Sequence, residues 1–215
     1  MQRSKYYEEF INQSLSRGKQ KLEGYNPNLL SLITIEERDD IETEIVNIFL
    51  ENKDYDLAAF FPKLKNYDGI SILKENLKNW EIPSDGSVAI AFALFDATND
   101  SSFLTIIDEN FKLSVKLDKV RITAQYSYHT PNKKIFEKLM KIYLNEDDKT
   151  VRNTAVIGLL YNCNLIINPL DTNELQKKID LRRKFNLENK SQRLNILNEI
   201  IDKKSYNKNS IDIYR

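Results

Sequence analysis

The sequence predicts an all-α protein, a solenoid of antiparallel helix pairs, because one short pattern recurs along the chain. The segment Asp118-Lys-Val-Arg-Ile-Thr-Ala124 returns downstream as Asp148-Lys-Thr-Val-Arg-Asn-Thr-Ala155, with one residue inserted, and occurs upstream as Asp85-Gly-Ser-Val-Ala-Ile-Ala91, without the arginine. A degraded first copy is Asp54-Tyr-Asp-Leu-Ala-Ala59. The four closing alanines lie 32, 33 and 31 residues apart, a period typical of repeat proteins. Short polar turns between the amphipathic segments make neighbouring helices antiparallel.

Each part of the pattern has a physical reason. A helix pair cannot bury its apolar face alone, so neighbouring pairs stack and share a core. We expect the aspartate to cap the helix N-terminus, and the valine and alanine, four residues apart, to lie on the buried face. Arg121 and Arg152 point away from that face, where each can brace a neighbouring carboxylate or a helix C-terminus. We therefore expect Ala91, Ala124 and Ala155 to be buried at helix contacts.

The pattern Asp-x(1,2)-Val-Arg-x-x-Ala, at the start of the second helix of a pair, resembles the signature of HEAT-like repeats over residues 35–165. The resemblance implies a right-handed superhelix in which the second helices line the concave surface. The copies are more compact than the roughly 40–47 residues of full HEAT or armadillo repeats. Tetratricopeptide and ankyrin repeats fit less well, because their Trp/Gly/Tyr pattern and Thr-Pro-Leu-His turn are absent.

Helical periodicity and capping signals place the expected elements in a single domain, residues 1–215. Its parts are an N-terminal helix and cap at 1–33, about four helix pairs at 34–165, C-terminal capping helices at 170–204 and a tail at 205–215. The expected helices span 2–16, 34–52, 55–65, 68–80, 85–98, 100–113, 117–129, 132–145, 148–162, 171–185 and 191–203. Thr34-Ile-Glu-Glu37 is a capping box, and Pro62 restricts its helix to a short or kinked element.

Composition narrows the class of protein. Of the 215 residues, 41% are hydrophobic and 30% charged, and no apolar run approaches the ~20 residues of a membrane span. The N-terminus lacks the apolar core of a signal peptide, and the lone Cys163 excludes an intramolecular disulfide, so we expect a partly buried, inert thiol and a cytoplasmic protein. We expect no metal and no cofactor, because the chain has one histidine and one cysteine and lacks a phosphate-binding loop, His-Glu-x-x-His and Cys-x-x-Cys.

Charge is distributed unevenly. Residues 1–110 hold 11 Lys and Arg against 20 Asp and Glu, a net charge of −9, whereas residues 111–215 hold 21 against 12, a net charge of +9. In a solenoid this asymmetry makes one end acidic and the other basic, although drift within solvated helix faces produces the same numbers. Three acidic residues, Glu37, Asp40 and Glu44, lie opposite an apolar line and are expected to face solvent or a partner.

The second helices supply further candidate binding residues. Polar side chains next to the buried pattern are expected on the concave surface, and tyrosine and arginine are enriched at protein interfaces. The tyrosines can instead be core residues that fill the space between repeats. His129 can instead interact with the C-terminus of its own helix. The full set expected to bind a partner is Glu37, Asp40, Glu44, Asp96, Gln125, Tyr128, His129, Tyr161 and Asn162. The same surface adjoins Arg121, Tyr126 and Arg152.

These observations favour a non-enzymatic, monomeric protein-binding module. Its small size, its Lys/Asn/Ile-rich composition and the opening Tyr25-Asn-Pro-Asn28-Leu-Leu before Thr34 resemble small bacterial HEAT-like immunity proteins of polymorphic toxin systems. That resemblance implies a toxin domain as partner, occluded by one face of the solenoid; a basic nuclease is one such toxin, steered by the acidic half. No membrane and no nucleic acid are expected as partners.

Two alternatives stay open. The first is an adaptor or scaffold for another protein. The second is a DNA glycosylase for alkylated bases, since some of these enzymes are built from HEAT-like repeats and use a catalytic aspartate beside aromatic residues. Asp96 would then be catalytic, with Trp80, Phe92 and Phe95 as the aromatic residues. The acidic half that holds Asp96 disfavours this reading, because it repels DNA phosphates.

Overall fold

The computed structural model describes residues 3–16 and 24–206, and every regular element within these ranges is a helix. The predicted all-α class is therefore confirmed. Of the expected tail, residues 207–215 lie outside the described residues. The chain divides into two compact units, residues 1–113 and 114–215. This division almost coincides with the change in charge: residues 1–113 carry 12 Lys and Arg against 20 Asp and Glu, net −8, and residues 114–215 carry 20 against 12, net +8.

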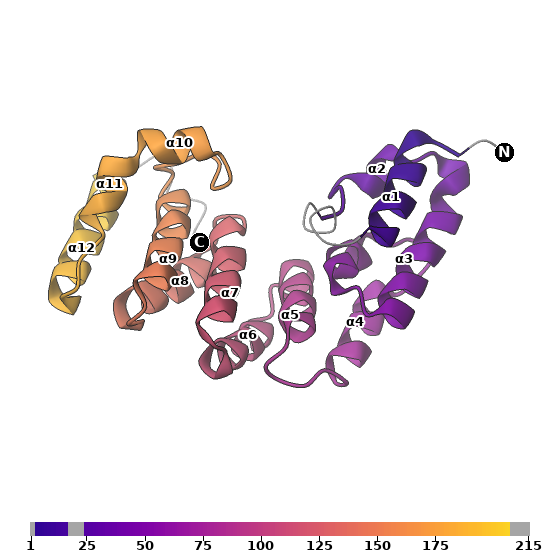
Figure 1. The fold of residues 1–215 in the computed structure, drawn as a ribbon, viewed down its shortest axis with the longest axis horizontal. Helices are drawn as coiled ribbons and strands as arrows, with labels where there is room; N and C mark the ends of the chain where they lie inside the picture. Colours follow the sequence, from indigo (N-terminus) through magenta and orange to yellow (C-terminus); the bar gives the residue numbers. More distant parts are fainter. Residues whose placement is uncertain (1–2, 17–23, 207–215) are drawn as a thin grey trace. The chain divides into compact units, whose positions relative to one another are not determined.

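The first unit begins with α1 packed on a short helix and continues with α3 and its partners (Figure 1). Its elements are α1 (Lys5–Leu15), α2 (Leu29–Leu32), η2 (Ile35–Glu37), α3 (Arg38–Asn52), η3 (Tyr55–Lys63), α4 (Gly69–Leu77), α5 (Asp85–Thr98) and α6 (Ser102–Leu113). The 3-10 helix η3 contacts α3, α4 and α5, and α5 also packs on α4 and α6. Pro62 lies inside η3, in agreement with the prediction of a short element there. The core is formed by Ile41, Ile45, Phe49, Leu57, Phe61, Leu73, Ile90, Leu94, Leu104 and Ile107.

In the second unit α7 contacts both the next helix, α8, and the next but one, α9. Its elements are α7 (Lys116–Tyr128), α8 (Lys133–Asn145), α9 (Lys149–Asn162), α10 (Thr172–Lys177), α11 (Ile179–Lys184) and α12 (Lys190–Tyr206). Figure 1 shows α7 beside α9, and α9 also contacts α11, while α8 packs on α9 and α12. The single helix expected at 171–185 is wrong: Lys178 leaves helical geometry, with φ −99° and ψ 15°, and separates α10 from α11.

The aspartates of the recurring pattern occupy different helix positions. Asp148 is the N-cap of α9 and accepts hydrogen bonds from two backbone N–H groups of its first turn, as predicted. In α5, however, Ser84 is the N-cap and Asp85 is the first helical residue. In α7, Asp118 lies inside the helix, which begins after Val115. The sequence pattern therefore repeats without fixing the point at which each helix starts.

The alanines change face as a result. Ala91 and Ala155 both lie seven residues after their N-caps and are fully buried. Ala124 lies nine residues after its N-cap and is only half-buried, so its predicted burial is wrong. A helix turns about 100° per residue, so a shift of two residues moves a side chain to another side. In the degraded first copy Ala59 is exposed and Ala58 is buried.

The close approach of α7 and α9 occurs at another pair of small residues. A Cβ atom added to Gly158 would lie 2.6 Å from the Cα of Ser127, so the two backbones nearly touch. The Ser127 hydroxyl donates a hydrogen bond of 2.8 Å to the carbonyl of Thr154, which satisfies this buried polar group. The C-terminal halves of α7 and α9 consequently lie side by side.

No helix within the described ranges combines the length and the apolar character needed to cross a membrane.

Candidate protein-binding surfaces

The acidic line predicted on α3 is only partly at the surface. Glu37 is 3% exposed, which contradicts its predicted position facing solvent or a partner. Its Oε1 accepts a 2.6 Å hydrogen bond from the backbone N–H of Ser4, the N-cap residue of α1. Hydrogen bonds from the side chain and then the backbone of Ser4 lower the pKa of Glu37. Glu37 is therefore a structural residue, buried because α1 docks over it.

The other two acidic residues reach the surface. Asp40 is exposed and pairs with the Arg3 guanidinium at 2.5 Å. The same guanidinium lies over the Tyr7 ring, 4.4 Å from its centroid. Glu44 is half-buried. Asp40 thus also helps to hold the start of α1, and the acidic line is interrupted by contacts that maintain the fold.

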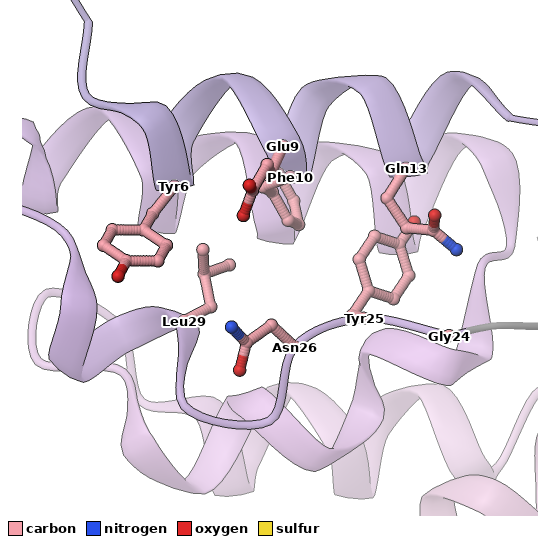
Figure 2. Close-up of a pocket in the computed structure, with 8 residues that line it drawn as sticks. All are labelled: Tyr6, Glu9, Phe10, Gln13, Gly24, Tyr25, Asn26 and Leu29. Carbon is pink, nitrogen blue, oxygen red and sulfur yellow. The ribbon is translucent and has the colours of Figure 1, made fainter.

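A pocket of about 170 Å³ opens between α1 and the segment that leads into α2 (Figure 2). Figure 2 shows Glu9 and Gln13 on the α1 side, with Tyr25, Asn26 and Leu29 on the opposite side. The other lining residues are Tyr6, Phe10 and Gly24. Sequence reasoning missed this site, because its lining depends on how α1 docks on residues 24–29.

Tyr25 is the best-fixed wall of the pocket. Its hydroxyl donates a 2.5 Å hydrogen bond to Asp54 Oδ2. Its ring packs against Phe10 at 5.4 Å, tilted by 36°, and against Phe60 at 6.2 Å, edge-on. Partial burial and the hydrogen bond to Asp54 raise the pKa of Tyr25 far above its ordinary value, so the phenol stays protonated.

The electrostatics of the pocket favour a cation. Glu9 is exposed at its rim and pairs at 3.4 Å with the exposed Lys5, one turn earlier on α1. The half-exposed rings of Tyr6 and Tyr25 offer π faces, which attract ammonium and guanidinium groups. The pocket therefore combines a carboxylate with aromatic surface, the two groups that attract a lysine or arginine side chain.

The candidate residues of the second unit lie near one another at the ends of two helices. Tyr128 and His129 close α7, and Tyr161 lies in the last turn of α9. Because Ser127 and Gly158 are in contact, these three side chains share one end of the unit. Tyr128 is exposed; His129 and Tyr161 are half-buried.

Two further predictions for this surface have mixed outcomes. Gln125 is exposed on α7 as predicted, but the neighbouring Tyr126 is fully buried, in agreement with the reading of some tyrosines as core spacers. The Nδ1 atom of His129 lies 2.9 Å from the Thr130 carbonyl oxygen, just beyond the end of α7. The exposed part of the surface is therefore Gln125 and Tyr128.

Asn162 is not a binding residue. It is fully buried, its Oδ1 accepts a 2.9 Å hydrogen bond from the Asn132 backbone N–H, and its Nδ2 donates to the Gly158 carbonyl at 2.9 Å. Asn110 repeats this arrangement in the first unit, where it joins the Ser84 backbone N–H to its own helix. Both asparagines satisfy the backbone at the start of an adjacent helix, and this explains their burial.

The two pattern arginines behave differently. Arg152 is 4% exposed; its guanidinium donates to the carbonyl oxygens of Glu146 and Asp147 and pairs with Glu188 at 2.8 Å. It braces the carbonyls at the end of α8 together with a carboxylate, as predicted. Arg121 is exposed and lies 3.6 Å from Asp118 within its own helix.

The residues proposed for a glycosylase do not meet. Asp96 is exposed near the C-terminal end of α5. Trp80 packs at the opposite end, where a Cβ atom on Gly86 would lie 2.4 Å from its ring, and ten residues of helix correspond to about 15 Å. Phe92 and Phe95 are buried in the core. These residues therefore do not form a site in which aromatic side chains surround Asp96.

Cys163 is buried, more completely than the predicted partial burial. The described residues contain no group of three His, Cys, Asp or Glu side chains placed to hold a metal ion. No protein-family model, curated protein or solved structure gives a significant match to this chain. The class of the protein thus rests on its own architecture, an all-helical chain of two units with opposite net charge.

Proposed function

We propose that the chain is a non-enzymatic protein-binding module of the HEAT-like type, a right-handed α-solenoid of antiparallel helix pairs. The packing of α7 on α9 and of α9 on α11 supports this proposal, because next-but-one contacts arise when helix pairs stack. Within this class, we propose an immunity protein that binds a toxin domain and covers its active site.

The pocket beside Glu9 is the observation that carries the proposal. It combines a carboxylate at the rim, two half-exposed tyrosine rings and a unit of net charge −8. Such a surface fits a basic protein partner, whose approach is accelerated by the acidic field and whose lysine or arginine docks on the rings. Contacts of this kind contribute about 0.5–2 kcal/mol each, depending on desolvation.

The contacts around the pocket support a preformed site. Tyr25 is held by Asp54 and two neighbouring rings, so it loses little conformational freedom when a partner binds. Phe10 and Leu29 form a buried apolar floor. The partner therefore meets a fixed aromatic wall next to an exposed carboxylate, and tyrosine is one of the residues enriched in interface hot spots.

A growth assay tests the immunity function. The protein encoded by the neighbouring gene is expressed alone in a bacterial host, and then together with this chain. We expect growth arrest in the first case and growth in the second, with a complex recovered from the second culture. Complex formation with a product that does not arrest growth would replace the immunity function by an adaptor function, and absence of a complex would remove this partner altogether.

A further inference from the structure

A second pocket, in the second unit, has the opposite chemistry. It measures about 170 Å³ and lies between α9 and α11. Its lining residues are Asn153 and Val156 of α9, Ile179, Arg182 and Arg183 of α11, and Asn186 just beyond α11. Every polar residue of this lining carries N–H donors, and none is acidic.

The two arginines differ in their present contacts. Arg183 pairs with Asp180 at 3.2 Å, but both side chains are more than two-thirds exposed, so water screens this pair and a ligand can displace it. Arg182 is half-buried, and among the described residues no carboxylate pairs with its guanidinium. Three exposed lysines, Lys177, Lys178 and Lys184, lie within two residues of lining residues in the sequence and add positive charge to this part of the unit.

The number and shape of the donors select the anion. A single carboxylate is satisfied by one guanidinium fork, whereas two forks and two amide groups match the three terminal oxygens of a phosphate monoester. The apolar side chains of Val156 and Ile179 leave a surface for the carbon body that carries the phosphate. We propose that this pocket binds a phosphate monoester, from either a small molecule or a phosphorylated side chain. This site is independent of the pocket beside Glu9.

The test is a titration of the isotope-labelled full chain, followed by NMR, with inorganic phosphate, phosphoserine, a phosphoserine-containing peptide and acetate at constant ionic strength. We expect saturable shifts of the Asn153 and Asn186 side-chain amides with the phosphate ligands and none with acetate. Phosphoserine binding as tight as that of the peptide indicates a small-molecule ligand; tighter binding of the peptide indicates a phosphorylated protein. Binding is also expected to strengthen as the pH rises from 5.5 to 7.5, because the second pKa of a phosphate monoester is about 6.

Two variants and a matched control decide the result. Arg182→Gln is expected to weaken phosphoserine binding about tenfold, because a hydrogen-bonded charge is lost. Arg183→Gln is also expected to weaken phosphoserine binding. Arg121→Gln removes an exposed arginine of α7 in the same unit and is expected to leave the affinity unchanged. Equal phosphoserine affinity of Arg182→Gln and the parent chain would overturn the proposal, and so would acetate-induced shifts as large as those caused by phosphate. A third contradicting result is a thymidine oligonucleotide that binds more tightly than phosphoserine to the parent chain and to both variants.

Discussion

Asn162 at the end of α9 accepts a 2.9 Å hydrogen bond from the backbone N–H of Asn132, the N-cap residue of α8. The cap residue thus has two roles, since its own side chain accepts from the N–H of Lys134 in the first turn. The Asn162 side chain is fully buried, and its oxygen and nitrogen both have protein partners. The contact joins the start of α8 to the end of α9, which lie side by side in this antiparallel pair.

Replacing Asn162 with leucine tests this contact. The variant leaves the Asn132 N–H without its partner, so we expect a loss of about 1–3 kcal/mol in the free energy of unfolding, measured by urea denaturation. Asn110→Leu is the matched variant in the first unit and is expected to behave alike. A stability equal to that of the parent chain would contradict the structural role of Asn162.

Gly158→Ala tests the close approach of α7 and α9. The added Cβ atom would lie 2.6 Å from the Cα of Ser127, and backbone cannot move aside as a flexible side chain can. We expect a destabilisation of about 1–3 kcal/mol from overpacking, despite the higher helix propensity of alanine. Gln125→Ala, at an exposed position on α7, serves as control and should change stability by less than about 0.5 kcal/mol.

Asp148→Asn tests the charged cap of α9. A hydrogen bond from Lys116, followed by backbone hydrogen bonds of the first turn, lowers the pKa of Asp148 from 3.8 to about 2. A lowered pKa in the folded state means that the ionised group stabilises the fold above pH 3.8, and that this contribution is lost as the pH falls toward 2. Asparagine still caps the helix, so only the charge is removed.

The stability of the parent chain should therefore exceed that of Asp148→Asn at pH 5–7, and the difference should shrink between pH 4 and pH 2. Chemical denaturation at a series of pH values measures both curves. A difference that stays constant down to pH 2 would show that the charge of Asp148 does not contribute.

Asp96→Asn addresses catalysis. Asp96 is exposed and lies at the other end of α5 from Trp80, so we expect no release of alkylated bases from duplex DNA by the parent chain or by the variant. The assay measures free base after incubation of the purified chain with alkylated DNA. Base release by the parent chain, abolished in the variant, would replace the binding function with a glycosylase.

The helices were predictable because their signals are local. Asp148 and the apolar periodicity mark a helix start and the helix faces within a few residues of sequence. The register of α7 was not predictable in the same way, because its start at Lys116 precedes the recurring aspartate and turns Ala124 off the buried face. Capping preferences rank residues but do not exclude an uncapped start such as Val115.

The site was harder to predict, because its residues are defined by tertiary contacts. Glu37 has the sequence context of an exposed acidic residue, but the docking of Ser4 and α1 buries it. Asn162 has the polarity of a surface residue and instead satisfies the start of α8. The pocket between α1 and residues 24–29 has no repeat in the chain, so no periodic signal indicates it.

The proposed function requires the acidic unit to bind a basic protein through the pocket beside Glu9. The affinity of Glu9→Gln for the protein encoded by the neighbouring gene tests this binding most directly. Titration calorimetry compares the parent chain, Glu9→Gln and Glu51→Gln, the last of which removes an exposed carboxylate of α3 outside the pocket lining. We predict that Glu9→Gln weakens binding about tenfold at low salt, and less at high salt, whereas Glu51→Gln has little effect. Equal affinities for Glu9→Gln and the parent chain at both salt concentrations would contradict the account.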